Sequence, residues 1–499
     1  MKRLSLAVSV CLSLLARAPA HAQAAPEALA LATAAIEAQG GERSLRRIES
    51  VRVRAMVHEH ALEQSVRPEG PYYENFSDLV ELRRPEGSTL LAESRSRGYR
   101  SRWWREPVWT ETATLVTGGA AFTTAGDELK PTSPALVPEA EESLALGPER
   151  ALLTALAADD LRRGAATLHG AEHDTLHFTW SGHPVTIYLS KADHMPAAVE
   201  LRRALPLDIF WSPWGDVISR TEWDAWTVEA EGLRYPRRWT TFSNGQVQRS
   251  RMIDGLEINP ADAALPEPGP DLIAAARAAS RPIDTLPFSP RGAVAVAPGV
   301  TLYVGPWNVT EIVHPGGVYV VEAPISSGYS RGVMEHVAKQ GPVLGVISTS
   351  DAWPHVGGLR QYAAAGTPIY ALDLNAPLIG RILAAPFDTR PDDLARQPRA
   401  AHLRLISNPT TIGRGADAFR ILPFRSATGE RQMALYWPAH RLLYTSDLIA
   451  VQSNGLWLPQ GRDEVAGLIA REVLDVETVF GMHYGPVAWA DVLEMEAVT

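Results

Sequence analysis

Three segments in the last third of the chain place histidine or aspartate after apolar stretches. The first runs Ile347-Ser-Thr-Ser-Asp-Ala-Trp-Pro-His-Val-Gly-Gly-Leu-Arg360 and contains His355. The second, Ala434-Leu-Tyr-Trp-Pro-Ala-His-Arg-Leu-Leu-Tyr-Thr-Ser-Asp-Leu448, contains Asp447, and the third, Phe480-Gly-Met-His-Tyr-Gly-Pro486, contains His483. Imidazole and carboxylate side chains bind metal ions and transfer protons. These residue types could therefore support metal-assisted or acid–base chemistry.

The order of these segments resembles the metallo-β-lactamase superfamily. The first segment has the frame of the family's H-x-H-x-D-H loop, which is followed by a Gly pair and a helix. The second resembles the segment around the metal-bridging Asp, and the third resembles the closing G-H-G turn. An acidic, Pro-terminated strand precedes the loop in the family, as Val318-Tyr-Val-Val-Glu-Ala-Pro324 does here. The resemblance covers residues 293–499 and implies an αββα sandwich.

The resemblance also implies a set of ligand positions, and most of them hold other residues in this chain. Four positions carry residues that are poor zinc ligands: Ser350, Ala352, Pro354 and Thr428. Three positions keep the ligand type of the family: His355, Asp447 and His483. By resemblance the protein is a metal-dependent hydrolase whose metal site is depleted.

The remaining ligands limit the chemistry. A two-zinc site of this superfamily needs three His around one metal, and an Asp and two His around the other. Two imidazoles and one carboxylate are the minimum for a mononuclear site, either open zinc or facial Fe(II). We expect at most one Zn or Fe ion, and hydrolysis if the protein is active. The alternative is an inactive binding or scaffolding protein, in which the three side chains hydrogen-bond one another.

A second catalytic pattern lies in Gly328-Tyr-Ser-Arg-Gly332, which matches the G-x-S-x-G sequence of serine hydrolases. Asp447 and His483 follow it in the Ser, Asp, His order of α/β-hydrolases. Ser330 nevertheless lies several residues beyond the strand that ends near Val321, whereas a nucleophile elbow turns directly off its strand. A serine hydrolase acting through Ser330 is a further alternative, and a Ser/Gly loop that caps the following helix is the competing interpretation.

Another group of titratable residues, His58, Glu59 and His60, alternates along a predicted strand in the N-terminal half. A zinc site needs at least three ligands from the protein. Because no motif places a third ligand beside these histidines, we interpret them as surface residues.

The first 22 residues have the composition of a signal peptide. Met1-Lys-Arg3 is positive, Leu4 to Ala16 is apolar, and Ala20-His-Ala22 is a cleavage site. The apolar run is too short to remain as a membrane span. Cys11 is the only cysteine and lies inside this segment, so the mature chain has no disulfide and no thiolate ligand. We expect a periplasmic or secreted protein with no integral membrane segment.

The charge of the chain is negative, and three cations fall inside the signal peptide. Removing Lys2, Arg3 and Arg17 takes the formal charge from −10 to −13. A chain this acidic is an unfavourable partner for nucleic acid or for an anionic membrane surface. We expect neither as a partner.

The sequence divides into four segments: signal peptide 1–22, N-terminal domain 23–258, Pro-rich linker with a short helix 259–292, and metallo-β-lactamase-like domain 293–499. In the N-terminal domain, Pro26 to Gln39 predicts a helix with one apolar face. Val51 to Val57 alternates as a half-buried strand does, and Asn-Gly inside Arg238 to Ile253 predicts a hairpin. The predicted fold class is α+β, with an antiparallel sheet and helices before the sandwich.

Tryptophan is concentrated in the N-terminal domain, which holds nine of the 14 residues, including Trp103 and Trp104. Such side chains could line a groove for an apolar ligand such as a lipid, or pack between strand faces. The sequence leaves both interpretations open, so the partner is an unknown small-molecule substrate or apolar ligand.

Overall fold

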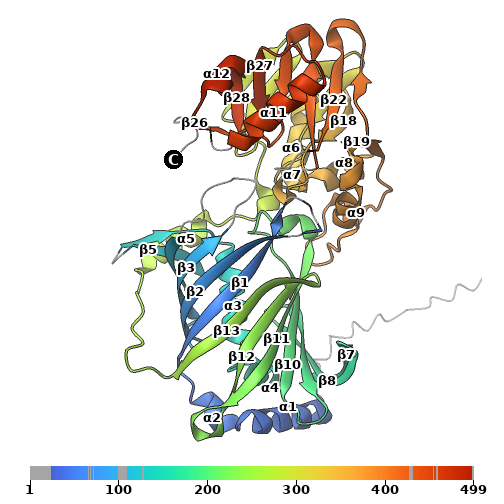
Figure 1. Cartoon of the computed structure of the whole chain (residues 1–499). Coiled ribbons are helices and arrows are strands. Elements are labelled where there is room, and N and C mark those ends of the chain that lie inside the picture. The colour runs from blue at the N-terminus through green and yellow to red at the C-terminus, as the bar shows by residue number, and fades with distance from the viewer. Residues whose placement is uncertain are drawn as a thin grey trace, which may run out of the picture.

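The structure is a computed structural model that describes residues 24–65, 67, 69–70, 72–98, 109–125, 128–425, 431–452, 455–456 and 459–496. The predicted signal peptide with Cys11, the residues Trp103 and Trp104, and Thr428 lie outside the described residues. The described chain forms a curved sheet in its N-terminal half and a two-sheet sandwich in its C-terminal half (Figure 1). The predicted α+β fold class is confirmed.

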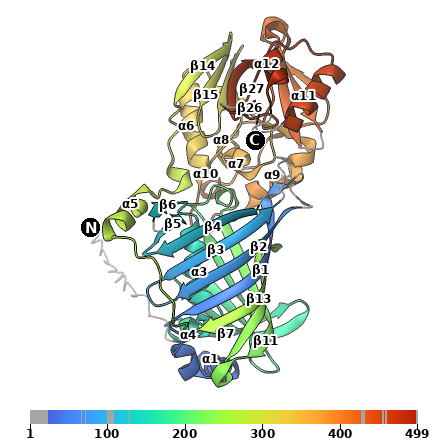
Figure 2. The same cartoon turned by 60° about the vertical axis from the view of Figure 1, so that its left-hand side comes forward.

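The N-terminal half forms one sheet of 13 strands, in which every pair of neighbours is antiparallel. The chain enters in the middle of the sheet at β1, and its last strand in this half, β13, returns beside β1 (Figure 2). In spatial order the strands are β6 (Glu128–Pro131), β5 (Ala120–Ala125), β4 (Trp109–Thr117), β3 (Thr89–Gly98), β2 (Tyr72–Arg84), β1 (Val51–Ser65), β13 (Gln246–Ile258), β12 (Arg234–Ser243), β11 (Asp216–Val228), β10 (Pro196–Ala204), β9 (His183–Ser190), β8 (Ala171–Trp180) and β7 (Arg162–Leu168).

Two local predictions for this half are confirmed. The predicted helix is α1 (Pro26–Gln39), whose apolar face joins the sheet core through residues such as Leu31 and Ile36. The Asn-Gly pair links β12 to β13, and Asn244 and Gly245 both have positive φ, 49° and 82°, as a tight hairpin turn requires. The other helices here are α2 (Glu42–Arg46), α3 (Leu136–Leu146) and α4 (Ala151–Leu156).

Two sheets face each other in the C-terminal half. The first runs in the order β14 (Gly292–Ala297), β15 (Val300–Val304), β16 (Val309–His314), β17 (Gly317–Val321), β18 (Val343–Ser348), β19 (Ile369–Leu372) and β20 (Leu403–Ile406). The second runs in the order β21 (Thr410–Ile412), β22 (Phe419–Phe424), β23 (Gln432–Trp437), β24 (Leu442–Tyr444), β27 (Thr478–Gly481) and β28 (Tyr484–Ala488). A short ribbon pairs β25 (Val451–Gln452) with β26 (Gly455–Leu456).

Helices cover the outer faces of both sheets. Alternate strand residues point to opposite faces, so apolar residues at both kinds of position must be buried on both sides of a sheet. In β17, Val321 joins the core between the sheets, whereas Val318 and Val320 pack against helices. The helices of the first sheet are α6 (Ser327–Val337), α7 (Trp353–Val356), α8 (Leu359–Ala365), α9 (Ala376–Ala384) and α10 (Asp393–Arg396). Those of the second sheet are α11 (Pro459–Arg471) and α12 (Trp489–Glu494). The predicted αββα layering is confirmed.

The segment between the two halves contains α5 (Pro270–Ala279), the short helix expected in the linker. Within the described ranges, no helix is both long enough and apolar enough to span a membrane.

An aromatic contact joins the two halves. Trp353 at the start of α7 lies against Trp211 and Trp214, with ring centroids 4.9 Å apart in each pair and interplanar angles of 81° and 68°. Edge-to-face rings add stabilisation beyond the area that they bury. Nearby, the Asp216 amide donates to the Pro386 carbonyl at 2.7 Å. The segment that connects β10 to β11 therefore packs directly on the helix that carries His355.

Replacing Trp353 with Ala tests this junction. Because the indole is only 6 % exposed, we expect Trp353→Ala to lower the free energy of unfolding by about 3–5 kcal/mol. Denaturant unfolding followed by circular dichroism measures the change. Trp109→Ala is the matched control, since Trp109 is 46 % exposed, and it should cost far less. Equal losses in the two variants would contradict a structural role for the Trp353 contact.

Candidate functional site

The structure brings His355, Asp447 and His483 together at one end of the sandwich. One ligand atom from each side chain lies within 4.8 Å of the others. His483 Nε2 is 2.8 Å from Asp447 Oδ1, and His355 Nδ1 is 3.9 Å from Asp447 Oδ2. His355 and Asp447 are buried, whereas the His483 side chain keeps 25 % of its exposure. Solvent therefore reaches this group from the His483 side.

Backbone contacts of residues 350–354 fix the start of α7, the helix that contains His355. Pro354 lies in the first turn of α7, where its missing N–H costs no helical hydrogen bond, and its carbonyl accepts from the Ile325 amide at 2.8 Å. Ser350 is buried and accepts from the Ala352 amide at 3.3 Å. The three replaced positions of this loop thus have structural roles. Thr428 is outside the described residues.

Asn308 holds the turn that carries His483. Its side-chain amide donates to the carbonyls of Gly481 and Tyr484, at 3.1 and 3.3 Å. Its backbone amide donates to the Met482 carbonyl at 2.9 Å. No sequence motif pointed to Asn308, although an Asn after a short Gly-Pro-Trp loop is a residue type suited to bonding backbone groups.

A buried carboxyl, Glu322, lies beneath the group. Its Oε1 accepts from the hydroxyls of Thr349 and Tyr444, the latter at 3.0 Å, and Thr349 Oγ1 is 2.6 Å from Ser446 Oγ. Glu322 and Ser446 both have positive φ, 76° and 55°, which is rare for residues other than glycine. Burial raises the pKa of Glu322 to about 7, against the lowering effect of hydrogen bonds from Thr349 and Tyr444. The floor of the site is a polar network with a carboxyl that titrates near neutrality.

Ser330 does not occupy a nucleophile elbow. It lies inside α6, which begins after the N-cap Ser326, and its side chain is fully buried. A Cβ on Gly358 would come within 1.9 Å of Ser330 Oγ, so the Gly pair of the loop allows α6 to pack closely here. A hydroxyl enclosed in this way has no access to a substrate. The interpretation as a Ser/Gly segment that caps a helix fits, with Ser326 accepting from the Tyr329 amide.

His58 and His60 are partly exposed, and the structure places beside them a third possible ligand that no motif indicated. Glu74 on β2 lies opposite His60 on β1, and the three side chains offer ligand atoms within 4.8 Å of one another. Glu59 points to the other face of the sheet and pairs with Arg249. The missing ligand comes from the cross-strand register, which no local motif encodes.

Most tryptophans among the described residues of the N-terminal half are packing residues. Trp223 and Trp239 belong to the core cluster of the sheet. Together with Trp211 they also line a cavity of about 130 Å³, whose wall includes Glu142 and Arg203. Paired charges make this cavity polar rather than a uniformly apolar groove.

Comparisons with known proteins concern the C-terminal half. No family model and no curated protein matches the chain. Among solved structures, the chain is similar to DIM-1 metallo-β-lactamase, with 14 % identity over 41 % of this chain and 94 % of that one, at a TM-score of 0.32. A metallo-β-lactamase from Hirschia baltica has 16 % identity, with 41 % and 95 % covered and a TM-score of 0.31. The metallo-β-lactamase FIM-1 from Pseudomonas aeruginosa, in its mono-zinc form, has 11 % identity over 41 % of this chain and 96 % of that one, at a TM-score of 0.32. These similarities bear on the fold alone.

The raised pKa of Glu322 predicts a pH dependence of stability. Between pH 4.5, the ordinary value, and about 7, Glu322 is protonated in the folded protein and ionised in the unfolded chain. The contribution of Glu322 to the free energy of unfolding, on the order of 3 kcal/mol, should therefore fall as pH rises through this window. Glu322→Gln should remove this part of the slope, as measured by urea unfolding at pH 4.5, 6 and 8. Glu93→Gln, an exposed control, should keep it, and an unchanged slope in Glu322→Gln would contradict the assignment.

The burial of Ser330 predicts that its hydroxyl takes no part in catalysis. Ser330→Ala should leave kcat/KM for any ester that the protein hydrolyses unchanged, because Oγ is enclosed between α6 and Gly358. The measurement is the initial rate with a p-nitrophenyl ester. A variant that folds with the wild-type melting temperature but loses most of its activity would restore the serine mechanism.

Proposed function

We propose that this chain is an exported, metal-dependent hydrolase that binds one zinc ion through His355, Asp447 and His483. The observation that carries the proposal is the convergence of these side chains, one from α7 and two from separate loops, to within 4.8 Å. Two neutral imidazoles and one carboxylate form the donor set of open zinc sites, and Fe(II) is the alternative ion for the same set.

The spacing of the donors fits a tetrahedral ion. Two ligand atoms that are each about 2.1 Å from such an ion lie roughly 3.4 Å apart. Asp447 Oδ1 lies 2.8 Å from His483 Nε2, and Asp447 Oδ2 lies 3.9 Å from His355 Nδ1, so each imidazole is spaced from a carboxylate oxygen by a distance close to this value.

A bound zinc ion supplies Lewis acidity that polarises a carbonyl or phosphoryl group and activates water. The residues of the chain provide the rest. His355 and Asp447 are buried, so they orient the site, while the exposed edge of His483 leaves an approach for substrate. The Trp307 ring, 6.4 Å from the His355 ring, offers an apolar wall beside it. We infer a small substrate with an apolar part.

The site supports one metal ion and not two. Ser350 and Ala352 offer a hydroxyl and a methyl group where the family has imidazoles, and Pro354 offers no carboxylate. With the hydroxyl of Ser350 already bonded to the Ala352 amide, a second ion has few donors among the described residues. Efficient two-metal hydrolysis, including β-lactam cleavage by that route, is not expected.

A second candidate function is a binding or scaffolding role without catalysis. The observation that favours it is the 2.8 Å contact between His483 and Asp447, which gives both groups a partner within the protein. In that case the N-terminal half, packed on α7 through Trp211 and Trp214, would serve to present the sandwich to a small or apolar ligand.

Metal analysis and hydrolysis separate the two candidates. The mature chain, loaded with zinc and dialysed, should hold one more ion than Asp447→Asn treated in the same way, as measured by mass spectrometry, and a chelator should abolish hydrolysis of a p-nitrophenyl ester. Asp447→Asn should lower the rate at least about 100-fold, because the carboxylate ligand is lost while the shape is kept.

The control for this experiment is His402→Gln, which removes an exposed histidine from the same half of the chain. It should leave the rate and the metal content of the sandwich unchanged. Hydrolysis that resists chelation and Asp447→Asn would contradict the metal mechanism. Stable binding of a ligand without any hydrolysis would favour the second candidate.

A further inference from the structure

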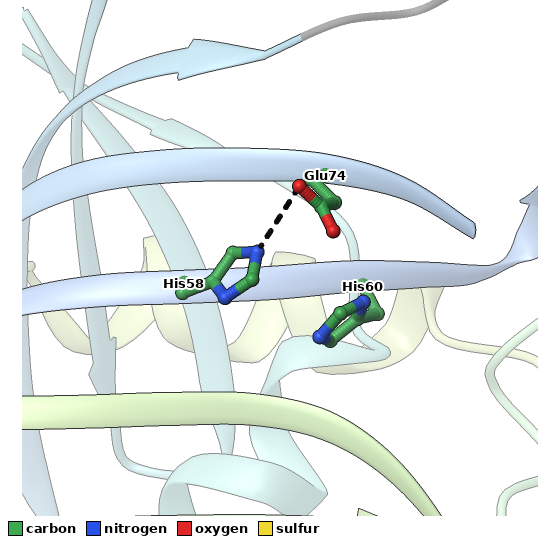
Figure 3. A group of neighbouring side chains, drawn as sticks. All are labelled: His58, His60 and Glu74. Carbon is green, nitrogen blue, oxygen red and sulfur yellow. Dashed lines mark ion pairs between the residues drawn. The ribbon is translucent and has the colours of Figure 1, made fainter. Parts of the chain in front are cut away.

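A separate group of metal-binding side chains lies on the N-terminal sheet. His58 and His60 are two residues apart on β1 and therefore share a face, and Glu74 on β2 is the direct cross-strand partner of His60. Figure 3 shows the two rings and the carboxylate side by side, with a dashed line from His58 to Glu74. That contact joins His58 Nε2 and Glu74 Oε2 at 3.6 Å, and the two imidazole centroids are 4.6 Å apart.

The surroundings hold these rings in place and favour the neutral form of His60. His58 stacks on Phe76 with a centroid distance of 4.5 Å and an interplanar angle of 4°. His60 meets Tyr72 edge to face at 6.4 Å. Burial lowers the pKa of His60, and the neighbouring His58 lowers it further. A neutral imidazole is the form that binds metal ions.

One nitrogen of His58 is buried and is not used in a hydrogen bond to any described residue, so it is available to bind a metal ion. His58 Nε2 is buried, and it has no hydrogen-bond partner among the described residues. The 3.6 Å that separates it from Glu74 is too long for a hydrogen bond but close to the spacing of two ligands on one ion, roughly 3.4 Å. An exposed pair of histidines would have its nitrogens hydrated instead.

We propose that His58, His60 and Glu74 form a second binding site for a divalent transition metal, with zinc as the simplest occupant. The donor set of two imidazoles and one carboxylate suits Zn²⁺, Ni²⁺ and Cu²⁺ better than Mg²⁺ or Ca²⁺. The site is independent of the sandwich group, because all of its ligands come from β1 and β2.

The position of the site gives it a structural consequence. The end of the β1–β2 hairpin lies beyond the ligands. There Leu62 belongs to the core cluster that contains Trp353, and the Glu69 carboxylate is 2.8 Å from the Arg431 guanidinium of the sandwich. An ion bound by both strands fixes the hairpin just before these contacts. Metal binding at the sheet therefore stabilises the junction of the two halves.

The test uses the mature chain with Asp447→Asn, in which the sandwich donor set is broken. Titration with Co²⁺, followed by visible absorption and calorimetry, should show one bound ion. His58→Gln, His60→Gln and Glu74→Gln should each weaken Co²⁺ binding at least about tenfold. Removing a residue that only hydrogen-bonds to a metal ligand already lowers metal affinity by about this factor, so removing a ligand should cost at least as much. Binding should also weaken from pH 7.5 to 5.5, as the imidazoles gain protons.

His169→Gln is the matched control, because His169 faces a single carboxylate, Glu222, at 2.9 Å and belongs to neither three-ligand group. This variant should bind Co²⁺ with the same affinity as the Asp447→Asn chain from which it is made. If the three ligand variants bind Co²⁺ as the parent does, or if His169→Gln loses as much, the proposal is wrong. A second measurement guards against misfolding: Zn²⁺ should raise the melting temperature of the otherwise wild-type chain, and His58→Gln should shrink the rise while the metal-free melting temperature stays unchanged.

Discussion

The buried carboxylate of Asp447 is the constraint on which the candidate site depends. A charge removed from water is strongly destabilising unless it is paired or binds a metal ion. Two imidazoles face this carboxylate, one from α7 and one from the turn after β27. Their loops must therefore meet at the end of β24, and the positive φ of Ser446, directly before Asp447, is part of how the chain achieves this. Strain of this kind persists only where surrounding contacts hold it.

The polar floor and the aromatic junction supply those contacts. Glu322 ties β17 to β18 and β24 through Thr349 and Tyr444, so it links the two sheets below the site. Above it, Trp353 is enclosed by two indoles of the N-terminal half, two residues before His355. A helix of only four residues has little stability of its own, so its position follows from this packing. The N-terminal sheet thus acts on the site through α7 without contributing a ligand to it.

Much of this arrangement could be predicted from the sequence, and the exceptions have a common cause. The helix Pro26–Gln39 and the Asn-Gly hairpin follow from local patterns, and His355, Asp447 and His483 follow from segments whose order matches a known fold. Glu74 could not be found in this way, because its closeness to His60 depends on the register of two strands joined by a hairpin. The burial of Ser330 could not be predicted from the sequence either. The G-x-S-x-G pattern specifies residue types, but it does not show that Ser330 lies in α6 or that Gly358 packs against it.

The two three-ligand groups share one donor set but differ in what holds them together without a metal ion. In the sandwich, Asp447 is 3 % exposed and lies 2.8 Å from His483 Nε2, so an ion that enters has to replace a contact that already exists. On the sheet, the Glu74 side chain is 48 % exposed and hydrated, and the histidines are held by Phe76 and Tyr72 instead of by the carboxylate. Water screens the charge of Glu74, so this carboxylate does not depend on the histidines to compensate its charge. Burial therefore ties the sandwich carboxylate to its histidines, whereas the sheet carboxylate faces solvent and its histidines depend on the aromatic rings of β2.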